Sequence, residues 1–129
     1  MVERVFLDAN VVLDHLTDRQ PFAEYAHRLF ALGETGQIAL SVSSLSICNL
    51  YYLLRKLNGK EQALALLGRL VQVVEVTPVG KLEIHKALAS GFNDFEDAVQ
   101  TQSAEAGGNV AVIITRNKQD FLEGNIPVQ

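Results

Sequence analysis

The sequence predicts a three-layer α/β/α sandwich with a central, mainly parallel sheet of about four to five strands. Short apolar runs that contain Val, Ile and Phe alternate with longer stretches of helical periodicity along the chain. Such alternation is typical of a parallel sheet whose connecting helices cover both faces. No repeat, low-complexity segment or linker divides the 129 residues, so a single domain is expected over residues 1–129.

The first half of the chain is expected to contain two strands and three helices. The strands are residues 2–7 and 38–42, and the helices are residues 21–34, 44–57 and 60–70. Both strands contain β-branched residues, which favour extended backbone, and Pro21 fits the first turn of a helix. Ser43 or Ser44 can cap the helix that follows the second strand. We assign no element to residues 9–20.

The second half is expected to add two strands and two helices. The strands are residues 71–76 and 110–114, and the helices are about ten residues after Pro78 and the stretch from Asp94 to about residue 106. The pair Gly107-Gly108 ends the second of these helices. Residues 126–128 are a candidate for a short final strand.

The composition excludes several classes of protein. The longest apolar runs have about five residues, against the ~20 that a membrane-spanning helix needs, and the N-terminus lacks the apolar segment of a secretory signal. A cytoplasmic protein without a membrane segment is therefore expected. The net charge of −4 argues against a basic protein that coats nucleic acid. The single cysteine, Cys48, cannot form an internal disulfide and is expected to be a buried thiol.

Three acidic residues are placed at or near the ends of predicted strands. Asp8 comes directly after the first strand, Asp97 lies in the first turn of a helix, and Asp120 follows the strand 110–114. Ligands of parallel sheets bind beyond the carboxyl ends of the strands, so these side chains are expected to share one pocket. Three carboxylates without a Cys or His cluster favour Mg²⁺ or Mn²⁺ over zinc. Setting them aside leaves 12 acidic against 11 basic residues, so the net charge says little about a nucleic-acid partner.

Four segments of the chain carry motifs in a fixed order. They are residues 5–14, 43–51, 97–99 and 113–121. The first contains Asp8 and Asn10 after a strand, and the last contains Thr115-Arg116-Asn117 and Asp120. This series resembles the sequence blocks of the PIN-domain ribonuclease family, in particular its VapC-like toxin type, and implies the PIN-like variant of the α/β fold.

The resemblance implies a metal-dependent endoribonuclease that hydrolyses RNA phosphodiester bonds with Mg²⁺ or Mn²⁺. Asp8, Asp97 and Asp120 match the family's catalytic metal ligands. The residues implied to support them are Asn10, Ser43, Asn49, Asp94, Thr115 and Asn117. Arg116 and Lys118 border Asp120 and are expected to contact RNA. By the same resemblance, the protein is the toxin of a toxin–antitoxin pair, forms a homodimer and is inhibited by a cognate antitoxin protein.

One position departs from the family's pattern. Asn49 stands on a predicted helix where the family usually carries Glu, so the site lacks one negative charge. Asp94 or Glu96 could supply the missing carboxylate. The alternative function is a catalytically weakened PIN fold that acts as an RNA- or protein-binding module. A haloacid-type phosphatase is disfavoured, because Asn10 stands where that class carries a second Asp.

Three further cations are candidates for contact with RNA phosphates. They are Arg19, Arg55 and Lys56. Because Arg55 and Lys56 come at the end of a predicted helix, compensation of the helix dipole is the preferred explanation for those two residues.

Overall fold

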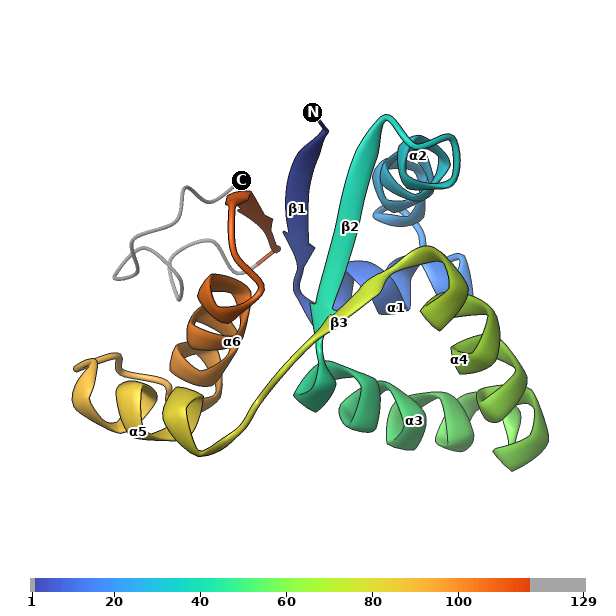
Figure 1. Cartoon of the computed structure of the whole chain (residues 1–129). Helices are drawn as coiled ribbons and strands as arrows, with labels where there is room; N and C mark the ends of the chain where they lie inside the picture. Colours follow the sequence, from blue (N-terminus) through green and yellow to red (C-terminus); the bar gives the residue numbers. More distant parts are fainter. Residues whose placement is uncertain (1, 117–129) are drawn as a thin grey trace.

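Four parallel strands form the centre of the molecule in the computed structural model, which describes residues 2–116 (Figure 1). The strands are β1 (Glu3–Leu7), β2 (Ile38–Ser43), β3 (Glu75–Thr77) and β4 (Val110–Ile114). They are arranged in the order β3-β2-β1-β4, and each neighbouring pair is parallel. The predicted parallel sheet is therefore confirmed, and the candidate strand at 126–128 lies outside the described residues.

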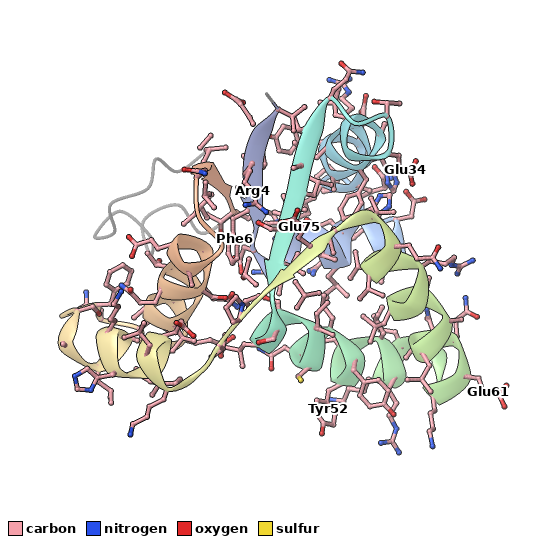
Figure 2. The ribbon with its side chains drawn as sticks, viewed as in Figure 1. Arg4, Phe6, Glu34, Tyr52, Glu61 and Glu75 are labelled. Atoms are coloured by element: carbon pink, nitrogen blue, oxygen red, sulfur yellow. The ribbon has the colours of Figure 1, made fainter. Side chains whose placement is uncertain are left out.

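Helices cover both faces of the sheet. They are α1 (Ala9–Thr17), α2 (Ala23–Glu34), α3 (Ser44–Asn58), α4 (Lys60–Val73), α5 (Lys81–Ala89) and α6 (Phe95–Ala106). Val5 and Leu7 belong to a core shared with α1 to α4, whereas Phe6 faces the other way and packs with Ala104 of α6 (Figure 2). Alternate side chains of a strand point to opposite faces, so this arrangement confirms the three-layer sandwich. Within residues 2–116 no helix is long and apolar enough to cross a membrane.

Helix α1 is the largest departure from the sequence prediction, which assigned no element to residues 9–20. Its cap is Asp8, whose Oδ1 accepts a hydrogen bond of 2.8 Å from the backbone N–H of Ala9. Val11, Val12 and Leu13 are buried in the main core. β-Branched residues such as the two valines have low helix propensity, so the sequence of this segment did not predict a helix. Burial against the sheet stabilises it instead.

Two predicted boundaries are wrong. The predicted strand 71–76 begins too early, because α4 continues to Val73 and β3 comprises Glu75–Thr77. Leu67 and Leu70 are buried on one face of α4, and the helix continues along that face to Val73. A short apolar run such as 71–76 does not by itself distinguish a helix from a strand. The second wrong boundary is the start of the predicted helix 21–34. In the structure α2 starts two residues later, at Ala23, because Pro21 lies in the turn before it.

The expectation for Cys48 is also wrong, because its thiol is exposed. The buried residues of α3 are Ser46, Leu50 and Leu54, spaced four apart. Cys48 lies two positions from both Ser46 and Leu50, which places it on the opposite side of the helix.

A buried polar network joins the start of α3 to α6. Ser43 caps α3, since its Oγ accepts a 3.0 Å hydrogen bond from the N–H of Ser46. The Ser43 hydroxyl donates to Oε1 of Gln100 at 2.5 Å, and Nε2 of Gln100 donates to Oγ of Ser46 at 2.8 Å. All three side chains are buried. The network therefore fixes the relative position of the two helices that carry Asn49 and Asp97.

Replacing Gln100 by Ala is expected to lower the free energy of unfolding by about 2 kcal/mol, because the buried hydroxyls of Ser43 and Ser46 each lose one hydrogen bond. Urea denaturation followed by far-UV circular dichroism measures this loss. The matched control is Gln102→Ala, a half-buried glutamine of the same helix, for which a change within about 0.5 kcal/mol is expected. Equal losses for both variants would contradict the importance of the network.

Candidate functional site

A polar cavity of about 520 Å³ opens beyond the carboxyl ends of the strands. We call it the acidic pocket. It is lined by Asp8, Ala9, Asn10, Asn49, Tyr52, Leu53, Asp94, Glu96 and Asp97. The structure thus brings together five residues that the sequence analysis placed in one site: Asp8, Asn10, Asn49, Asp94 and Asp97. They come from three separate parts of the chain, which the parallel sheet collects at one edge.

Asp8 is held at the end of β1 by its neighbours. Its side chain is buried, its Oδ1 caps α1, and its Oδ2 accepts a 2.8 Å hydrogen bond from the hydroxyl of Thr115. Its backbone N–H donates to the carbonyl of Ile114 at 3.0 Å, which joins the ends of β1 and β4. The N-terminal end of α1 stabilises a negative charge at this position. Thr115 therefore orients the Asp8 carboxylate in the pocket.

The first turn of α6 supplies the opposite wall. Asp94 caps this helix, because its Oδ1 accepts a 3.0 Å hydrogen bond from the backbone N–H of Asp97. Asp94 and Glu96 are exposed, and Asp97 is half-buried. Anionic groups so close together repel one another unless a cation lies among them. Among the described residues that line the pocket there is no Lys or Arg.

Asn49 reaches the pocket from α3 and contacts an acid of α6. Its Nδ2 donates a 3.0 Å hydrogen bond to Oε1 of Glu96. The carboxylate of Glu96 therefore lies beside the position where the sequence lacks a negative charge. Of the two acids considered as its substitute, Glu96 is the one that contacts Asn49 among the described residues.

The other predicted site residues have different positions. Ser43 does not line the acidic pocket, and its hydroxyl belongs to the buried network with Gln100. Asn117, Lys118 and Asp120 lie outside the described residues. Gln100 was missed by the sequence analysis, because a glutamine on a helix carries no signal of burial until its partners are known.

Arg116 binds an acid of α1. Its Nε donates to Oδ2 of Asp14 at 2.9 Å, and its Nη2 donates to Oδ1 at 3.2 Å. The guanidinium also stacks over the ring of Phe22 at 4.2 Å from the centroid. The Asp14 side chain is 2% exposed and that of Arg116 is 28% exposed. Asp14 was not among the predicted site residues, although an acid in a buried stretch of a helix signals a cationic partner.

Two histidines form a pair away from the acidic pocket. The Nδ1 atoms of His15 and His27 are 2.7 Å apart, and Nε2 of His27 lies 2.9 Å from Oδ1 of Asp18. The ring of His15 stacks on Phe30 with centroids 4.0 Å apart. Burial and the nearby His27 lower the pKa of His15 below 6.5, although Glu34 opposes the shift. A neutral His15 therefore joins α1 to α2.

The acidic pocket has the donor chemistry of a hard divalent cation. Its polar side chains are carboxylates, amides and one phenol, with no His or Cys among the described lining residues. Oxygen ligands of this kind suit Mg²⁺ or Mn²⁺. Within residues 2–116 no three Asp, Glu, His or Cys side chains are grouped so as to hold a metal ion by themselves. The third predicted ligand, Asp120, lies beyond that range.

The chain is similar in sequence to known proteins. The family model described as PIN domain matches residues 4–119. Ribonuclease VapC1 of Aquifex aeolicus (strain VF5) is 30% identical over 131 residues, which cover 98% of this chain and 89% of that protein.

The fold is shared with solved structures. A chain of VapBC2 from Rickettsia felis, bound to a DNA fragment from its promoter, matches with a TM-score of 0.73 at 16% identity, covering 98% of this chain and 97% of that chain. A chain of a toxin–antitoxin complex from Klebsiella pneumoniae matches with a TM-score of 0.70 at 18% identity, covering 97% and 95%. At these identities the likeness confirms the fold alone.

Proposed function

Because this chain belongs to the PIN-domain family, we propose that it is a metal-dependent endoribonuclease that hydrolyses RNA phosphodiester bonds. The observation that carries the proposal is the acidic pocket, which Asp8, Asp94, Glu96 and Asp97 line at the carboxyl edge of the sheet. The name of the relative from Aquifex aeolicus, a ribonuclease, supports the same activity.

The residues that would hold Mg²⁺ or Mn²⁺ are Asp8, Asp97 and Asp120. Asn10 lines the pocket beside Asp8, and Asn117 is a further candidate ligand by family resemblance. A divalent cation bound there lowers the pKa of water and offsets the negative charge that develops on the phosphate during cleavage.

Residues in and next to the pocket position these ligands. Thr115 holds Asp8 through a 2.8 Å hydrogen bond, and Asp94 holds the first turn of α6, which carries Asp97. Glu96 supplies the negative charge that Asn49 lacks, because its carboxylate is 3.0 Å from the amide nitrogen. This contact favours a retained activity over the alternative, a weakened PIN fold that only binds RNA or protein.

The proposed biological role is that of the toxin in a toxin–antitoxin pair. The Klebsiella pneumoniae structure that shares the fold is a toxin–antitoxin complex, which supports a cognate antitoxin as partner. A homodimer follows from the family resemblance. Lys118 and Arg116 are the proposed RNA contacts, and Lys118 is the stronger candidate because Arg116 already binds Asp14.

Incubating the purified chain with an unstructured RNA and Mn²⁺ is expected to give endonucleolytic products on a denaturing gel. Addition of EDTA is expected to lower the rate at least about tenfold, because a carboxylate cluster no longer has its cation. Excess Mn²⁺ should restore the rate. RNA cleavage that EDTA leaves unchanged would contradict a metal-dependent mechanism, and absence of cleavage at every Mg²⁺ and Mn²⁺ concentration would favour the binding module.

A further inference from the structure

A row of side chains, half-buried at Asn49 and exposed beyond it, continues from the acidic pocket along α3. Asn49, Tyr52, Leu53 and Lys56 are spaced three and four apart, so they share one face of the helix. Tyr52 and Leu53 line the acidic pocket and also a second hollow of about 420 Å³, whose other lining residues are Arg55 and Lys56. The two hollows are therefore adjacent along α3. We call Tyr52, Leu53, Arg55 and Lys56 the α3 track.

We propose that the α3 track binds the single-stranded RNA segment next to the phosphodiester that is cut, with a base stacked on Tyr52 and phosphates bound by Arg55 and Lys56. The inference rests on the proposed ribonuclease function and names the part of the surface that holds its substrate.

Tyr52 has the exposure and the support of a stacking platform. Its residue is 67% exposed, and it projects from α3 away from the sheet (Figure 2). The ring of Tyr51 packs edge-on against it, with centroids 5.4 Å apart and an interplanar angle of 72°. Exposed aromatic rings stack on unpaired bases without regard to sequence. Tyr52 therefore presents an exposed ring, supported by Tyr51, at the rim of the acidic pocket.

Arg55 and Lys56 supply positive charge, which is absent from the described residues that line the acidic pocket. Both are exposed, and neither forms a salt bridge with another residue in the range 2–116. Lys56 is seven residues beyond Asn49, a rise of about 10 Å along the helix, which equals about three nucleotides of a stacked strand. Cations at this distance can bind phosphates of an RNA chain whose scissile bond lies in the pocket.

The helix dipole favours these cations but does not set them apart from other cations of the chain. Both residues lie in the last turn of α3, where positive charge is favourable, but Lys86 in the last turn of α5 satisfies the same rule. What distinguishes Lys56 from Lys86 is the adjacent tyrosine and the hollow shared with the acidic pocket. Lys86 is therefore a matched control for Lys56.

The test measures binding of the full-length chain to a fluorescein-labelled unstructured RNA by anisotropy in EDTA, where no metal-dependent cleavage occurs. Tyr52→Ala is expected to raise Kd roughly tenfold, whereas Tyr52→Phe, which keeps the ring, should bind as the unmodified chain does. Lys56→Gln is expected to weaken binding a few-fold and to reduce the slope of log Kd against log salt by about 0.7. Tyr25→Ala and Lys86→Gln, at exposed positions of α2 and α5, are expected to change neither quantity.

Cleavage with Mn²⁺ is measured in parallel, and the track variants are expected to raise KM more than they lower kcat. If the unmodified chain cleaves RNA while Tyr52→Ala and Lys56→Gln bind as the two controls do, the α3 track is overturned and the ribonuclease function stands. That result would leave this face to a protein partner. If the unmodified chain neither binds nor cleaves RNA, the proposed function fails, and the track fails with it.

Discussion

Replacing Asp97 by Asn is expected to lower the rate of Mn²⁺-dependent RNA cleavage by about 10²- to 10³-fold. Asp97 lies half-buried in the acidic pocket, and it is one of the three proposed metal ligands. Loss of one carboxylate weakens metal binding and removes several kcal/mol of transition-state stabilisation, and each ~1.4 kcal/mol changes the rate tenfold. Initial rates with a labelled RNA over a range of Mn²⁺ concentrations measure the effect.

Glu105→Gln is the matched control for this prediction. Glu105 lies at the other end of α6 and does not line the acidic pocket, so the variant removes one negative charge from the same helix. Its cleavage rate is expected to remain within about twofold of the original, because Glu105 lies eight residues beyond Asp97, about 12 Å along the helix, which exceeds the Debye length of about 8–10 Å. Thermal melts establish that both variants are folded. Unchanged cleavage by Asp97→Asn would refute the site assignment.

Replacing Asp14 by Ala is expected to lower the free energy of unfolding by about 3 kcal/mol. The carboxylate is almost fully buried and binds the guanidinium of Arg116 through two hydrogen bonds. Removal of one partner leaves a charge without compensation, which costs about 3–5 kcal/mol in buried pairs. The lower end applies here, because the Arg116 side chain is 28% exposed and solvent screens part of its charge.

Two further variants separate the ion pair from general effects of mutation. Glu24→Ala removes the exposed partner of Arg28, whose contact lies on the surface of α2, and a loss below about 1 kcal/mol is expected. Asp14→Leu combined with Arg116→Met removes both charges and is expected to recover most of the loss. Urea denaturation compares all three variants. If the double variant is as unstable as Asp14→Ala, the packing of Asp14 rather than its charge decides stability.

The sequence by itself predicted the class of fold and the edge of the sheet where the acidic pocket lies. Alternation of strand-like and helical segments determines a parallel sheet covered on both faces, because each element must bury its apolar side. The position of Asp8 directly after a strand then determined the pocket, since parallel strands end at the same edge. Asn10, Asn49, Asp94 and Asp97 also line that pocket.

Helix α1 and the boundary between α4 and β3 could not be predicted in the same way. In both places apolar residues follow one another closely, and such runs fit a strand as well as a buried helix. The choice is made by the surface against which the side chains pack. Helix α1 buries Val11 and Val12 under the sheet, a contact that involves strands far away in the sequence.

What the chain's sequence determined is therefore the periodic pattern, the fold class and the edge that gathers the acids. What the tertiary structure alone decided is the set of pairings across long separations: Asp14 with Arg116, Asn49 with Glu96, and Gln100 with Ser43. The physical reason is that a polar side chain has many acceptable partners in principle, and burial next to one specific group selects among them. The sequence around a polar residue does not specify which distant group becomes its partner.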